Sequence, residues 1–177
     1  MGQHLVCFYE DVRELARTVA LRVADTLQSG GMAVTAAPTQ RLAAIDAALG
    51  ETGINIEAAS AAGSYVSFDS ELTARRIMAD DELDWDRIDA GLLAVIDSTP
   101  GNWTCRFAYG EISPLLWENG MIDAALRVEA RADELVAQTD MTLLCGYQRS
   151  LFTPCDLDAM RQLCQHHSYL MSLPFTP

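Results

Sequence analysis

The chain has 177 residues, 50% hydrophobic and 21% charged, which is the size and composition of one globular domain with a core. Its formal net charge is −13, and all 12 basic residues are Arg. The absence of lysine excludes a Schiff base, a lysine general base and the phosphate-binding lysine of a nucleotide loop, and a chain this acidic lacks the basic clusters that bind nucleic acid. It has no run of about 18 apolar residues and no leader-like start, so we expect a soluble cytoplasmic protein that does not contact a membrane.

Short apolar segments alternate with amphipathic segments along the chain. The first, "HLVCFY" at residues 4–9, is followed by a helix expected over about residues 11–29, which "GG" ends. The apolar side chains on one face of this helix recur at the 3.6-residue period and are Val12, Leu15, Ala16, Val19, Val23 and Leu27. "MAVTAA" and a helix from Pro38 to Gly50 repeat this order. The alternation favours an α/β fold of three layers, a mainly parallel sheet with helices on both faces, formed by residues 1–177 as a single domain. The other expected strands are at residues 64–69, 104–109 and 141–147.

Further helices are expected after residue 50. A short helical or turn segment is expected between Gly53 and Gly63, and Asp84 is a good N-cap for a helix with one apolar face. The tail "SLPFTP" is expected to be extended. Helices are also expected at about 70–79, at 110–120 with Ser113 and Pro114 as its start signal, and at about 121–138. A last helix is expected after Pro154, with Met160, Leu163, Cys164 and His167 on one side.

The carboxyl ends of parallel strands are where ligands bind in open sheets. In this chain they carry aromatic and acidic side chains instead of glycines and a lysine, so a phosphate site has been replaced. Aromatic rings would form an apolar or stacking pocket, and carboxylates would orient a polar or cationic group. Alternatively, the tyrosines are half-buried core residues, and the acids after the first strand only complement a helix dipole. The candidate ligand-binding residues are Tyr9, Glu10, Asp69, Tyr109, Gly110, Glu111 and Tyr147.

The five cysteines are expected to be reduced thiols, because no secretion signal is present. The segment "CDLDAMRQLCQHH" contains two Cys and two His, but it lacks the paired short spacings of a zinc site, so no metal and no other cofactor is expected. His167 is expected to be a hydrogen-bonded packing residue. With three histidines and no GxSxG motif, a catalytic Ser or Cys triad lacks an obvious base. Three cysteines, Cys7, Cys105 and Cys145, lie in expected strands, where a buried inert thiol is the usual state.

Four motifs in fixed order, "YGE", "LLWENG", "ALRVEARADEL" and "LLCGY", resemble the MEDS family, the methanogen/methylotroph DcmR-type sensory domains. The start "HLVCFYED" is similar to the opening of that family, and Cys164, His167 and Ser168 match its Cys-x-x-His-Ser ending. The resemblance implies a RecA/KaiC-like core without a phosphate-binding loop and a role in sensing small signals, including hydrocarbon-derived ones. It also implies that the strands with Cys7, Cys105 and Cys145 are neighbours, so that three thiols line one region and are candidates for thiol sensing.

The first hypothesis is therefore a non-catalytic sensory or regulatory domain of bacterial signalling that binds a small molecule at the strand ends. Domains of this family are commonly joined to an output module. We expect this one to act on a signalling protein, such as a kinase or transcription regulator, or on a second copy of itself. The second hypothesis is a metal-assisted hydrolase or residual nucleotide hydrolase that uses the acidic residues, which a bound divalent ion and turnover would reveal. The third is a protein-interaction scaffold whose outer surface carries the function.

Overall fold

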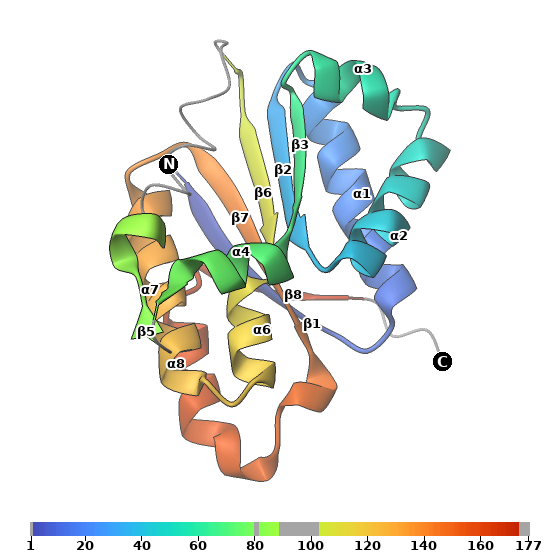
Figure 1. Ribbon diagram of the computed structural model, residues 1–177. Coiled ribbons are helices and arrows are strands. Elements are labelled where there is room, and N and C mark those ends of the chain that lie inside the picture. Colours follow the sequence, from blue (N-terminus) through green and yellow to red (C-terminus); the bar gives the residue numbers. More distant parts are fainter. Residues whose placement is uncertain (1, 80–81, 89–102, 174–177) are drawn as a thin grey trace.

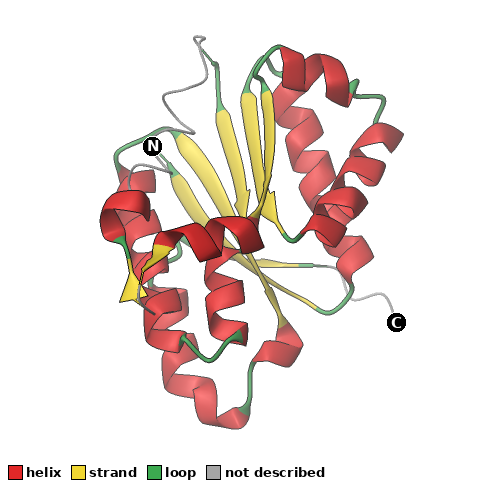
Figure 2. Ribbon diagram, in the orientation of Figure 1, coloured by secondary structure: helices red, strands yellow, loops and turns green. Residues whose placement is uncertain are grey.

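A computed structural model describes residues 2–79, 82–88 and 103–173. Its main sheet has six strands in the order β3-β2-β6-β7-β1-β8, and every neighbouring pair is parallel. Helices cover both faces of this sheet (Figures 1 and 2), which confirms the expected three-layer α/β fold. The strands are β1 (Gln3–Tyr9), β2 (Met32–Ala37), β3 (Tyr65–Asp69), β6 (Arg106–Gly110), β7 (Met141–Gln148) and β8 (Tyr169–Ser172).

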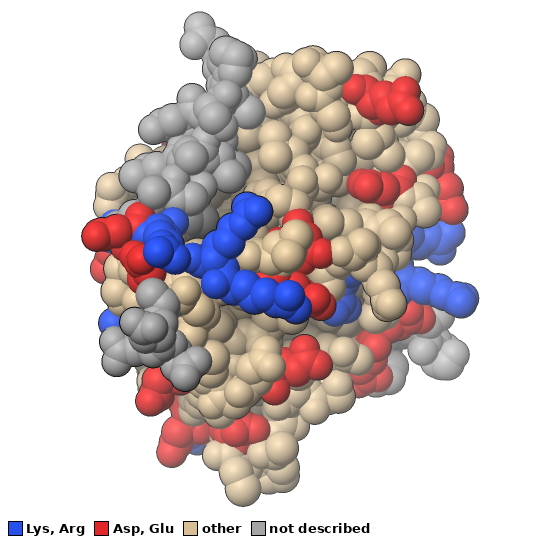
Figure 3. All heavy atoms as spheres, viewed as in Figure 1, with Lys and Arg blue, Asp and Glu red and all other residues tan. Residues whose placement is uncertain are grey.

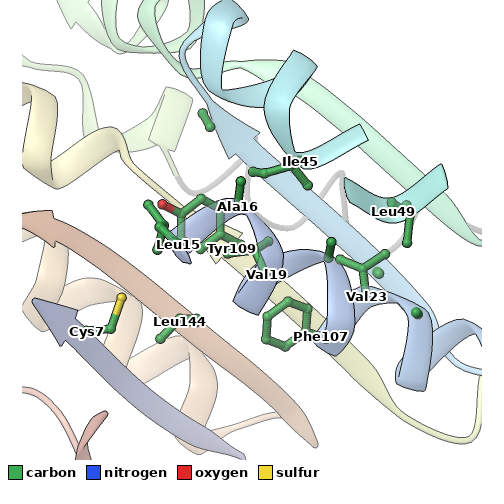
Figure 4. Close-up of a cluster of buried hydrophobic side chains, with 14 of the residues drawn as sticks. Cys7, Leu15, Ala16, Val19, Val23, Ile45, Leu49, Phe107, Tyr109 and Leu144 are labelled. Carbon is green, nitrogen blue, oxygen red and sulfur yellow. The ribbon is translucent and has the colours of Figure 1, made fainter. Parts of the chain in front are cut away.

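One face of the sheet packs against α1 (Val12–Gln28) and α2 (Thr39–Glu51), with the short α3 (Ile56–Ala61) beside them. The apolar period of α1 is confirmed, because Leu15, Val19 and Val23 are fully buried. These side chains meet sheet residues such as Phe107 and Leu144 in one cluster (Figure 4). Val12 was expected to face inward with them, but it lies in the first turn of the helix and is exposed.

The opposite face is covered by α4 (Ser70–Ile77), α6 (Ile112–Glu118), α7 (Ile122–Ala137) and α8 (Leu157–Gln165). Its core contains a group of aromatic rings in which Trp117 meets Tyr147 edge-on at 6.0 Å and Phe152 at 5.0 Å between ring centroids. Such tilted ring pairs add to the stabilisation from apolar burial. Leu163 of α8 is fully buried in the same core, whereas Cys164, expected on that side of the helix, is exposed.

Two helix boundaries differ from the sequence expectation. The helix α2 continues through Gly50, and the chain turns at Gly53, whose φ of 82° is free of strain only for glycine. The helix expected to reach residue 79 ends at Ile77, because the next residues form β4 (Met78–Ala79), which pairs with β5 (Glu82–Leu83) in a small antiparallel sheet. The helix expected after Asp84 is present at 85–88, and the rest of it lies outside the described residues.

The later boundaries also shift. The strand expected from residue 104 begins at Arg106, and α6 begins at Ile112, ahead of the Ser-Pro pair. Two 3-10 turns, η1 (Arg149–Leu151) and η2 (Pro154–Asp156), precede α8. The edge strand β8 was not expected, and only the first two residues of the tail "SLPFTP" are described. Within the described ranges, the helices are too short or too polar to span a bilayer.

Candidate functional site

The turn between β1 and α1, where a nucleotide-binding protein keeps its phosphate loop, is acidic. The Oδ1 atom of Asp11 accepts a hydrogen bond from the backbone N–H of Arg13 at 2.7 Å and so caps the helix. Glu10 is exposed and forms an ion pair with Arg149 at 3.4 Å. A carboxylate already occupies the positive end of this helix, so the turn would repel a phosphate group.

A buried polar network joins the carboxyl ends of β1 and β6 to α2. The Nη1 atom of Arg41 donates to the Tyr9 hydroxyl at 2.5 Å, and its Nε atom lies 2.8 Å from Oε1 of Glu111. The Tyr109 hydroxyl donates to the same Glu111 oxygen at 2.6 Å. Burial raises the pKa of Glu111 to about 7, although Arg41 and Tyr109 both favour its charged form.

The other strand-end candidates lie elsewhere. Asp69 caps α4 through the backbone N–H groups of Glu71 and Leu72 and accepts a hydrogen bond from Thr39. Gly110 ends β6 on the side away from α1, where it lines the cavity described below. Tyr147 points to the α7 side of the sheet, where its hydroxyl donates to Oε1 of Glu129 at 2.7 Å. Of the seven candidates, the structure thus brings only Tyr9, Tyr109 and Glu111 together.

A second polar cluster, the His4–Glu129 cluster, lies on the α7 side. It consists of His4, Glu129, Cys145 and His167, and one ligand atom of each lies within 4.8 Å of all the others. The Nε2 atoms of His4 and His167 are 3.2 and 3.3 Å from Oε2 of Glu129. The Cys145 sulfur is 3.4 Å from the same oxygen and 3.4 Å from Nε2 of His4. The four side chains come from β1, α7, β7 and the turn after α8.

Both imidazoles of this cluster are held by the main chain. Nδ1 of His4 lies 2.7 Å from the carbonyl oxygen of His166, and Nδ1 of His167 lies 2.7 Å from that of Leu163. A carbonyl oxygen only accepts, so each Nδ1 carries a proton and each Nε2 faces the cluster. Burial disfavours the Glu129 charge, but polar contacts with His167 and His4 outweigh it and hold the pKa of that carboxyl well below its usual range.

The cysteines do not form one thiol region. The strands β6, β7 and β1 are neighbours, as the resemblance implied. Cys7, however, faces the α1 side (Figure 4), and Cys145 faces the α7 side. Gly110 of β6 pairs with Cys145, and Cys105 lies five residues before Gly110. At the rise of a strand, five residues separate Cys105 from the level of Cys145 by about 16 Å. Burial raises the pKa of Cys7 to about 12 and, with the nearby Glu129 charge, raises that of Cys145, so neither thiol is an activated nucleophile.

A largely apolar cavity of about 510 Å³ lies on the sheet face opposite α1. Its floor is made by alternate residues of β2, β6 and β7, because side chains two apart on a strand point to the same face. Helices α4, α6 and α7 supply its walls. Three arginines also line it, and Figure 3 shows basic side chains crossing the surface over α4. The floor includes Val34, Ala36, Ala108, Gly110, Leu143 and Cys145, and the arginines are Arg76, Arg87 and Arg106.

Sequence reasoning missed three of the residues that matter here. Arg41 lies on a helix with no sign of a polar partner, and Glu129 stands in the middle of an apolar helix face. His4 was noted only as the start of a strand. His167 was expected to be a hydrogen-bonded packing residue, and its buried ring does bond the Leu163 carbonyl oxygen. One signal could have found Glu129. A carboxylate on the buried face of a helix needs polar partners, and the histidines of the chain could supply them.

Comparison with known proteins gives one family. The sequence model of the MEDS family, described as the MEthanogen/methylotroph, DcmR Sensory domain, matches residues 3–168. A search of curated proteins gives no match.

Proposed function

The chain belongs to the MEDS family of sensory domains, and from this premise we propose that it is a non-catalytic sensor that binds a small, mostly apolar molecule. The observation that supports this most is the cavity on the β2, β6 and β7 face. Its volume of about 510 Å³ falls within the roughly 300–1,000 Å³ of small-molecule sites. We place the binding site in this cavity, which lies against the middle and carboxyl end of β6.

The strand-end network is a weaker candidate for the site. Its hydroxyl, guanidinium and carboxylate groups already bind one another, and Tyr9, Tyr109 and Glu111 are each almost fully buried. A ligand would have to break these contacts before it could gain its own, which costs about 1–3 kcal/mol for each buried group left without a partner. We assign this network the role of fixing the ends of β1 and β6 beside the cavity.

The polar groups of the cavity indicate the class of molecule. Arg106 lines the cavity, and its buried Nε atom has no hydrogen-bond partner. Arg87 donates to the backbone carbonyl oxygen of Arg76, which holds the Arg87 guanidinium beside the cavity. The guanidinium groups only donate hydrogen bonds, and Glu129, the acid among the lining residues, already accepts from Tyr147, so the wall favours an apolar molecule that carries one acceptor or anionic group. The cationic ligand that the acidic strand ends suggested fits this wall less well.

The hydrolase hypothesis depends on acidic groups that converge on a metal ion at the strand ends. Glu10 is exposed and paired with Arg149, and Asp69 caps α4. The third acid, Glu111, is held by Arg41. The three carboxylates therefore have separate partners, which favours the sensor over a hydrolase at this edge.

The test is native mass spectrometry of the protein purified from its own host under reducing conditions. We expect one bound small molecule per chain. Ala108→Phe fills the cavity floor and should abolish this mass, whereas Ala47→Phe, on an exposed position of α2, should retain it. A bare wild-type chain, or a ligand that survives in Ala108→Phe, would exclude the cavity as the binding site.

The bound state would pass to a protein partner through the edge strand β8. Tyr169 and Leu170 of this strand are 61% and 63% exposed, and β8 is the last strand of the sheet among the described residues. An open edge of this kind pairs with a strand of another chain. Cross-linking in host cells should capture a signalling partner with the wild type but not with Leu170→Glu. Leu21→Glu, which replaces a 57% exposed leucine on α1, should still capture it. Sedimentation velocity of the purified chain shows whether the partner at β8 is a second copy, which gives a dimer, or another protein, which leaves a monomer.

A further inference from the structure

We infer that His4, Glu129, Cys145 and His167 form a binding site for one divalent transition metal ion of the zinc class, which ties the two ends of the chain together. Two of its residues, Glu129 and Cys145, also line the cavity proposed above, but the metal is tested by its own measurements. It follows from the direction, spacing and burial of the four side chains.

The direction of the donor atoms is the first argument. Each histidine donates its Nδ1 proton to a backbone carbonyl, which leaves the Nε2 lone pair as the group that faces the cluster. Metal-binding histidines are held in this way, with one nitrogen on the metal and the other on a carbonyl or carboxylate. Nε2 of His167 is buried and has no hydrogen-bond partner.

The spacing is the second argument. Bonds of about 2.0–2.1 Å to nitrogen or oxygen and about 2.3 Å to sulfur place tetrahedral ligand atoms about 3.3–3.6 Å apart. Four of the six separations in the His4–Glu129 cluster are 3.2, 3.3, 3.4 and 3.4 Å, and the other two are within 4.8 Å. The four short separations are close to the edge lengths of a zinc tetrahedron.

Burial is the third argument. The side chains of His4 and Glu129 are 0% exposed and that of His167 is 1% exposed, so bulk water does not solvate their Nε2 and Oε2 atoms. A divalent cation bound between them would satisfy these buried atoms together.

The surrounding groups complete the site. The Tyr147 hydroxyl holds Oε1 of Glu129 and leaves Oε2 for the metal. The carboxylate of Asp133 lies 3.7 Å from Nδ1 of His4 and strengthens that imidazole as a ligand. On binding, the Cys145 thiol gives its proton to solvent, and the sulfur–metal bond replaces the S–H bond. Two imidazoles, one thiolate and one carboxylate are the mixed N, S and O donors that suit Zn²⁺.

Four protein ligands fill a tetrahedral zinc ion, so the site is of the structural type. It would join β1, β7, α7 and the turn that leads into β8. The backbone N–H of Ser168 already donates to the carbonyl oxygen of His4 at 2.7 Å, which places the start of β8 beside the first ligand. The metal would therefore stabilise the edge strand as well as the core.

The test uses Co²⁺ as a spectroscopic substitute for Zn²⁺. The background is a full chain with Cys155→Ser and Cys164→Ser, which removes the two exposed thiols. After the protein has been stripped with a chelator, we expect one equivalent of Co²⁺ to bind with a thiolate-to-cobalt charge-transfer band and tetrahedral visible bands. Cys145→Ser should lose the charge-transfer band. Cys7→Ser, a buried thiol on the opposite face, should keep it.

Glu129→Gln and Tyr147→Phe distinguish a ligand from a positioning residue. Tyr147→Phe should keep all bands and weaken Co²⁺ binding about 10–100-fold. Glu129→Gln removes a ligand and should lower the Co²⁺ affinity by more than Tyr147→Phe does. Circular dichroism confirms that each variant is folded. Zinc analysis of the wild-type protein from zinc-supplemented cells gives a reading that needs no variant, and we expect one zinc per chain. The inference is overturned if the folded wild type binds neither Zn²⁺ nor Co²⁺, or if the charge-transfer band survives in Cys145→Ser.

Discussion

Glu111 makes the stability of this protein depend on pH in a direction opposite to that of most carboxylates. Burial raises its pKa from 4.5 to about 7, so the folded chain binds this proton more tightly than the unfolded chain. The stabilisation is then complete below about pH 4.5 and is lost as the pH rises through about 7. Integration of the two titrations predicts a loss of about 2.5 kcal/mol in the free energy of unfolding between pH 5 and pH 8.

The assay is urea unfolding of the wild type and of Glu111→Gln at pH 5, 6, 7 and 8. The variant cannot titrate at this position, so the difference between the two proteins isolates Glu111 from all other groups. The charges that act on it are those of Arg41 on α2 and Glu118 on α6. The hydroxyls of Tyr9 and Tyr109 and the thiol of Cys7 lie in the same environment.

We expect the wild type to lose about 2.5 kcal/mol relative to Glu111→Gln over this pH range. Glu118→Gln is the matched control, since it removes an exposed neighbouring charge and should leave the profile of the wild type nearly intact. A difference between wild type and Glu111→Gln that stays constant from pH 5 to pH 8 would refute the reasoning. It would mean that Arg41 and Tyr109 keep Glu111 charged despite its burial.

Three further predictions follow from packing and burial. Gly146→Ala should destabilise the fold by about 1–3 kcal/mol, because the added Cβ would lie 2.5 Å from the Tyr109 hydroxyl oxygen. Gly50→Ala on α2 has open space around it and should stabilise the fold by about 0.5–1 kcal/mol. Equal effects of the two variants in urea unfolding would contradict this. Trp117→Ala should cost about 3–5 kcal/mol in the same assay, and a cost below about 1 kcal/mol would show that the ring cluster is not a core. In native protein, an alkylating reagent followed by mass spectrometry should modify the two exposed cysteines and spare Cys7 and Cys145 until the chain unfolds. Rapid labelling of either buried thiol would restore the thiol-sensing hypothesis.

The sequence predicted those features that depend on neighbouring residues. The 3.6-residue period of α1 and the apolar strands β2 and β7 are local patterns, and they led to the correct fold class. The end of α2 was misplaced because Gly50 fits a helix when nothing crowds it, and only Gly53 has the positive φ that a turn there requires. The strand β8 was missed because a four-residue edge strand is set by its pairing with β1.

The polar sites depend on contacts between distant parts of the chain. Residues such as Tyr9 and Tyr147 stand at the ends of neighbouring parallel strands, but a shift of one residue in a strand turns a side chain to the opposite face. Local patterns therefore could not separate the strand-end network from the His4–Glu129 cluster. The latter joins His4 near one end of the chain to His167 near the other, a contact that no spacing motif records.

The central claim is that a small apolar guest enters the cavity on the β2, β6 and β7 face. The most direct measurement is methyl NMR of alanine-labelled protein under xenon pressure, because xenon enters apolar cavities. We expect shifts for the methyl groups of Ala108 and Ala132, which line the cavity, and none for Ala16 and Ala20 on the α1 side. Shifts confined to the α1 side, or no shift at either pair, would contradict it.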